Sequence, residues 1–259
     1  METVGIVAAL SQESEALLQR IGQWEHIPIG RFRAYRFRLP ERDCLLIESG
    51  MGIQRAANAT RALLAMADPH FLVSFGVAGA VEEDLQIGDV VLARNTYSLD
   101  HGIPGPLHRL ASFSDTARQA VAQVLEPRAA RLYSGTAITT RGSQIVSRQV
   151  QTIEHPILEM ETVGIARIAE EEGRPLLSLR AISDCPREPI PFNPDPSTDE
   201  EGNLRLGSMI LMVIGQPKII FHSIRLLRNV RRAADNAATA LIAALRQPIV
   251  IPSQNHINP

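Results

Sequence analysis

Two short segments combine charged side chains with apolar neighbours in a way that could support catalysis. Glu159-Met160-Glu161 places two carboxylates around a methionine at the start of a helical pattern, and Arg180-Ala181-Ile182-Ser183-Asp184 closes an apolar strand pattern. An arginine in a buried strand requires an anionic partner, because an isolated charge is costly to bury. Asp184 is either a helix cap or a proton donor to a leaving group. Glu161, taken alone, is an acid that compensates the helix dipole.

A third acidic residue, Glu13, follows the first apolar run of the chain, Val4 to Ala8. A carboxylate between a strand and a helix can act as a general base. The alternative is a solvated acid in the first helical turn, which the helix dipole favours.

Two glycine-rich segments follow apolar runs and could approach an anion through backbone N–H groups. Ser49-Gly50-Met51-Gly52 lies close to Arg55, and we treat Gly50, Gly52 and Arg55 as candidate phosphate ligands. The segment lacks the Lys-Ser/Thr ending of a P-loop, so a tight strand-to-helix turn is the alternative. Gly76-Val77-Ala78-Gly79 is expected to be a turn after a strand, where small residues either cradle a ligand or allow close packing.

The elements that position these residues alternate between short apolar runs and helical patterns, which is typical of an α/β fold. Such sheets bind ligands at the carboxyl ends of their strands. We expect a single domain over 1–259, with a twisted mixed central sheet flanked by helices. The expected strands are 4–8, 31–39, 43–48, 71–75, 90–93, 131–139 and 175–183, and the expected helices are 11–21 (with Ser11 as N-cap), 53–66, 115–125, 161–172 and 217–245.

Composition narrows the class of protein. The 259 residues are 45% hydrophobic and carry a net charge of -2, which gives no general attraction to nucleic acid. The two cysteines, Cys44 and Cys185, are not arranged as metal ligands, so we expect no metal site and no organic cofactor. The absence of a signal-peptide pattern and of a ~20-residue apolar span predicts a cytoplasmic protein.

The C-terminal part differs in composition from the rest of the chain. Residues 186–203 hold five prolines and five acidic residues, which predicts a long loop. Residues 204–246 read as a C-terminal helical segment, with Lys218, Arg225, Arg228, Arg231 and Arg232 on the first half of its long helix. A basic amphipathic helix either contacts an anionic membrane surface or packs on the sheet with its arginines in water.

These segments, in this order, resemble the nucleoside phosphorylase and nucleosidase superfamily. The resemblance rests on five motifs and is strongest to the 5′-methylthioadenosine/S-adenosylhomocysteine nucleosidases. Within the superfamily the chain looks most like the hopanoid-associated phosphorylases, on account of 73–79 and a tail with Leu206-Gly207, Gln216-Pro217 and an arginine-rich helix. The five motifs are 5–13, 49–52, 75–79 with Gly88-Asp89-Val90-Val91, 159–161 and 180–184.

The resemblance implies a purine nucleoside phosphorylase-like fold, a homo-oligomer, and cleavage of the N-glycosidic bond of an adenosine-type nucleoside. Asp184 would protonate the base, Glu13 would orient or deprotonate the attacking water, and Arg180 would neutralise phosphate or orient water. Glu161 would hold the ribose hydroxyls and favour a cationic sugar. The remaining residues implied to bind substrate are Met160, Glu159, Gly76, Val77, Ala78, Gly79 and Ser183.

The chain departs from the family pattern at three places. Val77 stands where nucleosidases have a hydroxyl residue, Ser143 where they have an aromatic residue, and the Gly-x-Pro-x-Arg phosphate motif is absent. The absent phosphate motif and Glu13 favour hydrolysis, whereas the C-terminal tail favours phosphorolysis. We expect phosphorolysis of a lipid-linked (hopanoid) adenosyl nucleoside, with inorganic phosphate as co-substrate. The alternatives are a hydrolytic 5′-methylthioadenosine/S-adenosylhomocysteine nucleosidase and a non-catalytic nucleoside-binding protein.

Overall fold

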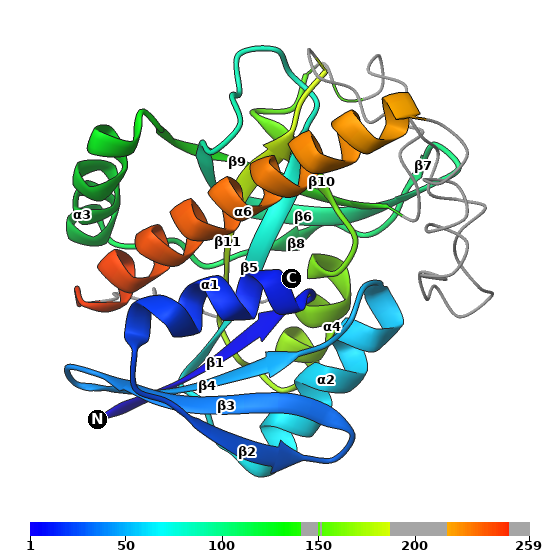
Figure 1. The fold of residues 1–259 in the computed structure, drawn as a ribbon. Coiled ribbons are helices and arrows are strands. Elements are labelled where there is room, and N and C mark those ends of the chain that lie inside the picture. The colour runs from blue at the N-terminus through cyan, green and yellow to red at the C-terminus, as the bar shows by residue number, and fades with distance from the viewer. Residues whose placement is uncertain (141–149, 151, 187–216, 249–259) are drawn as a thin grey trace.

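A mixed β-sheet passes through the centre of the molecule (Figure 1). The computed structural model describes residues 1–140, 150, 152–186 and 217–248, with side chains in the last segment from Arg225 onward. In chain order the elements are β1 (Glu2–Ala8), α1 (Ser11–Ile21), β2 (Glu25–Ile29), β3 (Phe32–Leu39), β4 (Arg42–Glu48), α2 (Ile53–Met66), β5 (Phe71–Ala80), β6 (Val90–Asp100), β7 (Ile103–Pro104), β8 (His108–Arg109), α3 (Asp115–Leu125), a 3₁₀ turn (Glu126–Arg128), β9 (Leu132–Thr140), β10 (Pro156–Glu159), α4 (Thr162–Glu171), β11 (Leu176–Asp184) and α6 (Pro217–Leu245).

The order of the strands brings distant parts of the chain together at one edge of the sheet. The order is β10-β9-β6-β11-β5-β1-β4-β3-β2, and β11, β5, β1 and β4 are mutually parallel. The carboxyl ends of these four strands therefore lie at the same edge. They carry Asp184, Gly76–Gly79, the entry to Glu13, and Ser49-Gly50 in that spatial order.

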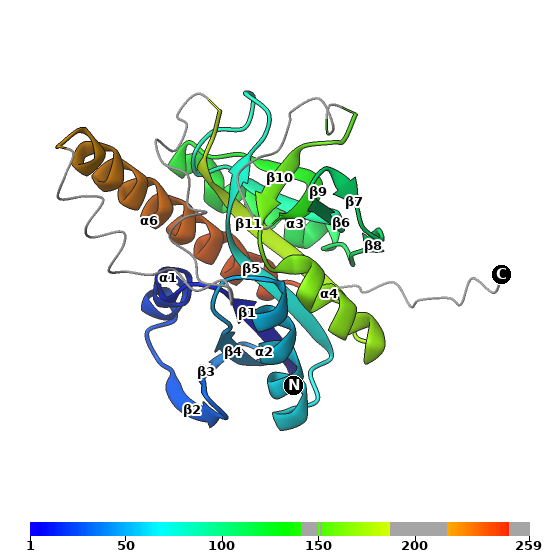
Figure 2. The same ribbon diagram turned by 90° about the vertical axis from the view of Figure 1, so that its right-hand side faces the viewer.

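Helices cover both faces of the sheet, as the expected α/β class requires. One core cluster joins the sheet to α1, α3 and α6, and a second joins it to α2 and α4. Figure 2 shows α1 and α6 on one side of the strands and α2 and α4 on the other. The predicted fold class is confirmed.

Two local expectations are wrong, and four of the strands that the structure describes, β2, β7, β8 and β10, were not expected. The segment Gly76–Gly79 is not a turn but the end of β5, because β11 pairs along one edge of it and β10 pairs with Gly79 and Ala80. The N-cap of α1 is Leu10 and not Ser11, since the backbone N–H of Leu10 donates to the side chain of Glu13. The strand Glu25–Ile29 was not expected, because its alternation is broken by Pro28.

Helix α4 approaches α2 closely at Gly164. A Cβ on this glycine would lie 2.2 Å from the backbone carbonyl oxygen of Ile53, which cannot move away without shifting the start of α2. We expect Gly164→Ala to lower the free energy of unfolding by about 1–3 kcal/mol, as overpacked cores do. Chemical denaturation measures the loss, and Arg167→Ala, at an exposed position of the same helix, is the control. Equal stability of the two variants would show that the contact with Ile53 is not limiting.

Part of the expected C-terminal region lies outside the described residues. This applies to almost all of the predicted loop at 186–203, to 204–214 and to the segment around Ser143. Among the described residues, the structure has no helix that is long and apolar enough to cross a membrane.

Candidate active site

Glu13 is fully enclosed at the sheet edge, although it stands in the first turn of a surface helix. Its Oε2 accepts hydrogen bonds from the backbone N–H groups of Ala9 (2.9 Å) and Leu10 (2.8 Å), and its Oε1 accepts one from Val77 (2.9 Å). Burial raises the pKa of Glu13, while the charge of Arg180 and the three N–H donors oppose the rise. Since Oε1 accepts one hydrogen bond, it retains a lone pair for a further donor.

Gly76 provides the space for this carboxylate. A Cβ at Gly76 would lie 2.2 Å from Oε1 of Glu13 and 2.8 Å from Nη1 of Arg180. The glycine therefore allows the two charged groups to meet over the strand.

Arg180 supplies the positive charge at the centre of the site and is 1% exposed. Its Nη2 donates to Oε2 of Glu159 (3.0 Å), and Glu159 is the buried anionic partner that the sequence requires. The same nitrogen donates to Ser74 (3.0 Å) and Thr162 (3.3 Å), and Nη1 donates to the carbonyl of Val77 (3.3 Å). Both Nη atoms thus have protein partners, while the buried Nε has no hydrogen-bond partner among the described residues. The role of Arg180 towards phosphate or water stays a prediction.

Glu159 has its two carboxylate oxygens engaged by the protein. Oε1 accepts from the hydroxyl of Thr139, and Oε2 accepts from the backbone N–H groups of Glu161 (2.9 Å) and Thr162 (2.7 Å) as well as from Arg180. It caps the start of α4 and fixes the guanidinium. The predicted contact of Glu159 with substrate stays a prediction.

Glu161 is 4% exposed and lies between α2 and the arginine. Its Oε1 accepts from the backbone N–H of Gly52 (2.9 Å), and its Oε2 lies 3.6 Å from Nη1 of Arg180. Burial raises the pKa of Glu161 to about 7, assisted by the charge of Glu159 and opposed by Arg180. Three carboxylates thus share one guanidinium, so the site has an excess of negative charge when all three are ionised.

The raised pKa of Glu161 predicts a pH-dependent stability. The pKa of Glu161 is about 7 in the folded protein and near 4.5 in the unfolded chain, so the folded protein binds this proton more tightly. Protonated Glu161 therefore stabilises the fold at low pH, and this contribution is lost as the pH rises through about 7. Relative to the parent, Glu161→Gln should gain on the order of 2–3 kcal/mol in free energy of unfolding between pH 4.5 and 8. Thermal melts across this range test the trend. Glu171→Gln, at the exposed end of α4, is the control variant, and a flat profile for Glu161→Gln would contradict the assigned pKa.

Asp184 stands at the other end of the site, where β11 bulges between Ile182 and Asp184. Its Oδ1 accepts from the hydroxyl of Ser183 (2.7 Å), which also contacts the carbonyl of Ala78 (3.3 Å). Burial raises the pKa of Asp184, against the effect of this hydrogen bond. Gly79 faces the carboxyl group, because a Cβ there would lie 2.7 Å from Oδ2.

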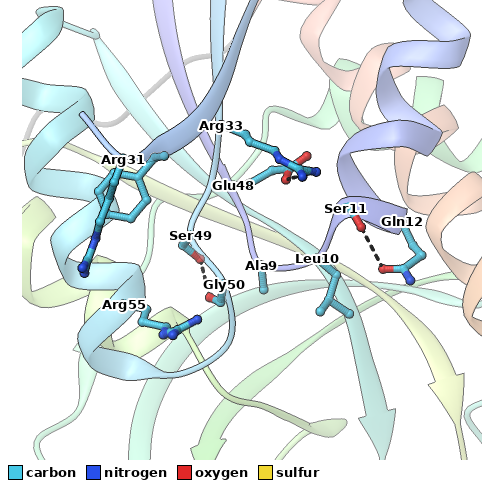
Figure 3. Close-up of a pocket in the computed structure, with 11 residues that line it drawn as sticks. Ala9, Leu10, Ser11, Gln12, Arg31, Arg33, Glu48, Ser49, Gly50 and Arg55 are labelled. Carbon is cyan, nitrogen blue, oxygen red and sulfur yellow. Dashed lines mark hydrogen bonds and ion pairs between the residues drawn. The ribbon is translucent and has the colours of Figure 1, made fainter. Parts of the chain in front are cut away.

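The glycine turn after β4 does not form the predicted phosphate cradle. The N–H of Gly50 donates to the carbonyl of Ala9 (3.1 Å), and that of Gly52 donates to Glu161. Both N–H groups are used within the protein, so the structure does not support phosphate binding by these two residues. Arg55 instead lines a cleft of about 440 Å³ beside the turn (Figure 3).

The remaining predicted residues lie beside this cluster. Val77 and Met160 are half-buried, and the valine side chain packs against the core. Three hydroxyl residues that the sequence analysis missed hold the charges in place: Ser74, Thr139 and Thr162. A serine within the apolar run 71–75 and a threonine directly after Glu161 were the available signals.

One group of side chains has the composition of a metal site. Potential ligand atoms of Glu82, Asp84 and His155 lie within 4.8 Å of one another. His155 Nδ1 is already 3.1 Å from Glu82 and 3.8 Å from Asp84, as an ion pair would place it. The expectation that the protein needs no metal or organic cofactor stays a prediction.

The chain is similar in sequence to nucleosidases of known name. The 5′-methylthioadenosine/S-adenosylhomocysteine nucleosidase of Tolumonas auensis is 28% identical over 213 residues, which cover 76% of this chain and 90% of the relative. The enzyme of the same name from Haemophilus influenzae is 26% identical over 195 residues, covering 70% and 85%.

Solved structures show the same fold. The 5′-methylthioadenosine/S-adenosylhomocysteine nucleosidase of Colwellia psychrerythraea, in complex with adenine, matches with a TM-score of 0.69 at 16% identity, over 96% of this chain and 98% of that one. The futalosine hydrolase of Helicobacter pylori matches with a TM-score of 0.66 at 19% identity, over 94% and 97%.

A family model described as the phosphorylase superfamily matches residues 3–214, which include Glu13, Glu161, Arg180 and Asp184. The match spans most of the chain and contains the whole charged cluster. The chain therefore belongs to the phosphorylase superfamily, as its five motifs predicted.

Proposed function

We propose that this protein hydrolyses the N-glycosidic bond of an adenosine-type purine nucleoside. The observation that carries the proposal is the position of Glu13. Its carboxylate takes the backbone N–H groups of Ala9, Leu10 and Val77, which are donors that an attacking phosphate would need. An anion at this position repels phosphate and can accept a proton from water.

The chemistry divides between the two ends of the sheet edge. Asp184 donates a proton to the purine as the C1′–N9 bond breaks, and burial raises the pKa of this carboxyl group, which favours its protonated form. Water forms the new C–O bond at C1′ and loses a proton to Glu13. The products are the free base and a free sugar.

The charge balance of the site favours this reaction in a second way. The sugar becomes positively charged as the base leaves. Glu161 and Glu13, which Arg180 neutralises only in part, stabilise that charge from buried positions beside the sugar. Arg180 and Glu159 act through these groups as positioning residues.

The relatives support an adenosine-type substrate. The similar proteins of Tolumonas auensis and Haemophilus influenzae are named as nucleosidases of 5′-methylthioadenosine and S-adenosylhomocysteine, which are both adenosine nucleosides. The test is release of adenine from these two nucleosides, with and without inorganic phosphate. We expect equal release in both conditions. A strict requirement for phosphate would replace hydrolysis by phosphorolysis, and a lack of release would remove the adenosine substrate.

Phosphorolysis of a lipid-linked adenosyl nucleoside is the second candidate, and helix α6 favours it. Arg225, Arg228, Arg231 and Arg232 are exposed on α6, and Leu227 among them is 54% exposed. Such a surface suits contact with anionic lipid. Co-sedimentation with anionic vesicles at low salt supports this candidate, and failure to bind them removes the membrane contact. The expected homo-oligomer and cytoplasmic location stay predictions.

A further inference from the structure

A basic cleft lies next to the candidate active site and has no part in the chemistry described above. It has a volume of about 440 Å³ and is bordered by Arg31 and Arg33 of the β2–β3 hairpin, by Arg55 of α2 and by Glu48 at the end of β4 (Figure 3). Three arginines and one carboxylate thus line the cleft, and Arg33 is the arginine that lies beside Glu48.

The acceptors within the cleft do not balance these cations. Arg55 is half-buried, and among the residues that the structure describes it has no hydrogen-bond or ion-pair partner. A Cβ at Gly50 would lie 2.8 Å from Nη1 of Arg55, so the glycine makes room for the guanidinium. A half-buried arginine that has no hydrogen-bond acceptor among the described residues can bind an anion through its N–H groups.

Among the described residues that line the cleft, Glu48 is the only acid, and its carboxylate already has partners. Glu48 accepts a hydrogen bond from the hydroxyl of Ser14 and one from Tyr35 (3.4 Å), and its Oε2 is 4.0 Å from Arg33. Arg31 lies 5.6 Å over the ring of Phe32, a contact that leaves its N–H groups free for a ligand. The cleft therefore carries net positive charge.

The position of the cleft relates it to the sugar end of a bound nucleoside. Along the sheet edge, Asp184 on β11 is followed by Val77 on β5, by Glu13 after β1 and by Gly50 after β4. A nucleoside with its base at Asp184 and its ribose near Glu13 points its sugar substituent toward β4. Leu10 lies between the candidate active site and the cleft. Its backbone N–H donates a hydrogen bond to Glu13, and the residue also lines the cleft.

We propose that the cleft binds an anionic group on the 5′ substituent of the nucleoside, so that the enzyme prefers substrates with a 5′ carboxylate or phosphate. This inference rests on the proposed function and adds the substrate class. Bidentate hydrogen bonding from Arg55, with Arg31 and Arg33 around it, recognises such a group. Free inorganic phosphate has the same chemistry and is separated from the substrate group by the experiment.

The experiment compares two adenosine substrates that differ only in charge: the 5′-carboxymethylthio acid and its amide. We expect the acid to have a kcat/KM at least about tenfold higher than the amide. The ratio should fall to near one in Arg55→Gln, fall below one in Arg55→Glu, and be largely kept in Arg55→Lys. The control is Arg61→Gln, further along α2, where an exposed arginine pairs with Glu171 and the ratio should stay unchanged.

The outcomes distinguish an anionic 5′ group of the nucleoside from free inorganic phosphate as the ligand of the cleft. An acid-to-amide ratio near one in the parent, or one that Arg55→Gln does not change, overturns the proposal while adenine release upholds the proposed function. Acceleration by inorganic phosphate would identify free phosphate as the occupant and also overturn it. If neither nucleoside releases adenine, the proposed function fails, and calorimetric binding of the two nucleosides then tests the cleft separately. Tighter binding of the acid than of the amide, lost in Arg55→Gln, supports an anion site in the cleft. Equal binding of the two overturns it.

Discussion

Replacement of Asp184 by Asn is expected to lower kcat by about 10²–10⁴-fold, because an amide cannot deliver the proton that the departing purine needs. The side chain keeps its size, so the hydrogen bond from Ser183 and the space opposite Gly79 are retained. Nucleoside binding should persist. Steady-state turnover of adenosine nucleosides, together with calorimetric binding of the same nucleosides, measures both properties.

The pH profile gives this prediction a second readout. Burial raises the pKa of Asp184, so the active, protonated form is lost as pH increases and kcat falls on the alkaline side. Asp184→Asn should lack that alkaline limb. Asp115→Asn, at an exposed position in the first turn of α3, is the control with unchanged turnover. A variant that turns over at the parental rate would assign Asp184 to capping alone.

Replacement of Glu13 by Gln should reduce kcat by a similar factor, about 10²–10⁴-fold, since water loses its proton acceptor. The amide also places an N–H₂ group where the carboxylate accepts hydrogen bonds from Val77 or from Ala9 and Leu10. A loss of stability of about 1–3 kcal/mol should accompany the loss of turnover. Activity is therefore measured at a temperature where thermal melts show the variant to be folded.

Two further variants separate chemistry from folding at this site. Glu15→Gln changes an exposed acid two residues along the same helix and should leave kcat and stability unchanged. Gly76→Ala keeps every charged group but places a Cβ 2.2 Å from Oε1 of Glu13, so it should lower kcat by displacing the carboxylate. Full activity of Glu13→Gln would exclude a general base at this position.

The α/β class and most helices were predictable from the sequence because apolar periodicity depends on local spacing. The ends of strands were less predictable. Strand β5 continues through Gly76–Gly79, where glycine normally indicates a turn, because pairing with β10 and β11 stabilises the extended backbone. Such pairing joins segments far apart in the chain and leaves no local pattern.

The cluster of Arg180, Glu159 and Glu161 was likewise predictable only in part. The sequence indicated that Arg180 needs an anion, since charge in an apolar strand is costly, and it marked Glu159 and Glu161 as acidic neighbours of a helix. It could not show that Glu159 would be the partner and Glu161 the residue held by Gly52, because the sheet order decides this. The supporting hydroxyls of Ser74 and Thr139 were missed for the same reason.

The position of Glu13 also changes which nucleophile the residues favour. The sequence alone left water and phosphate open, and the glycine turns suggested phosphate. The structure places the N–H groups of Val77 and Gly52 on carboxylates of the protein itself. This arrangement is the reason for proposing water as the nucleophile.

The most direct test of this account follows the oxygen that reaches C1′. The reaction is run in ¹⁸O-labelled water containing inorganic phosphate. The sugar product is reduced at once with borohydride, and its mass is determined by mass spectrometry. The account predicts one ¹⁸O atom in a free sugar released in equal amount to adenine. A sugar 1-phosphate without the label would contradict it and assign the site to phosphorolysis.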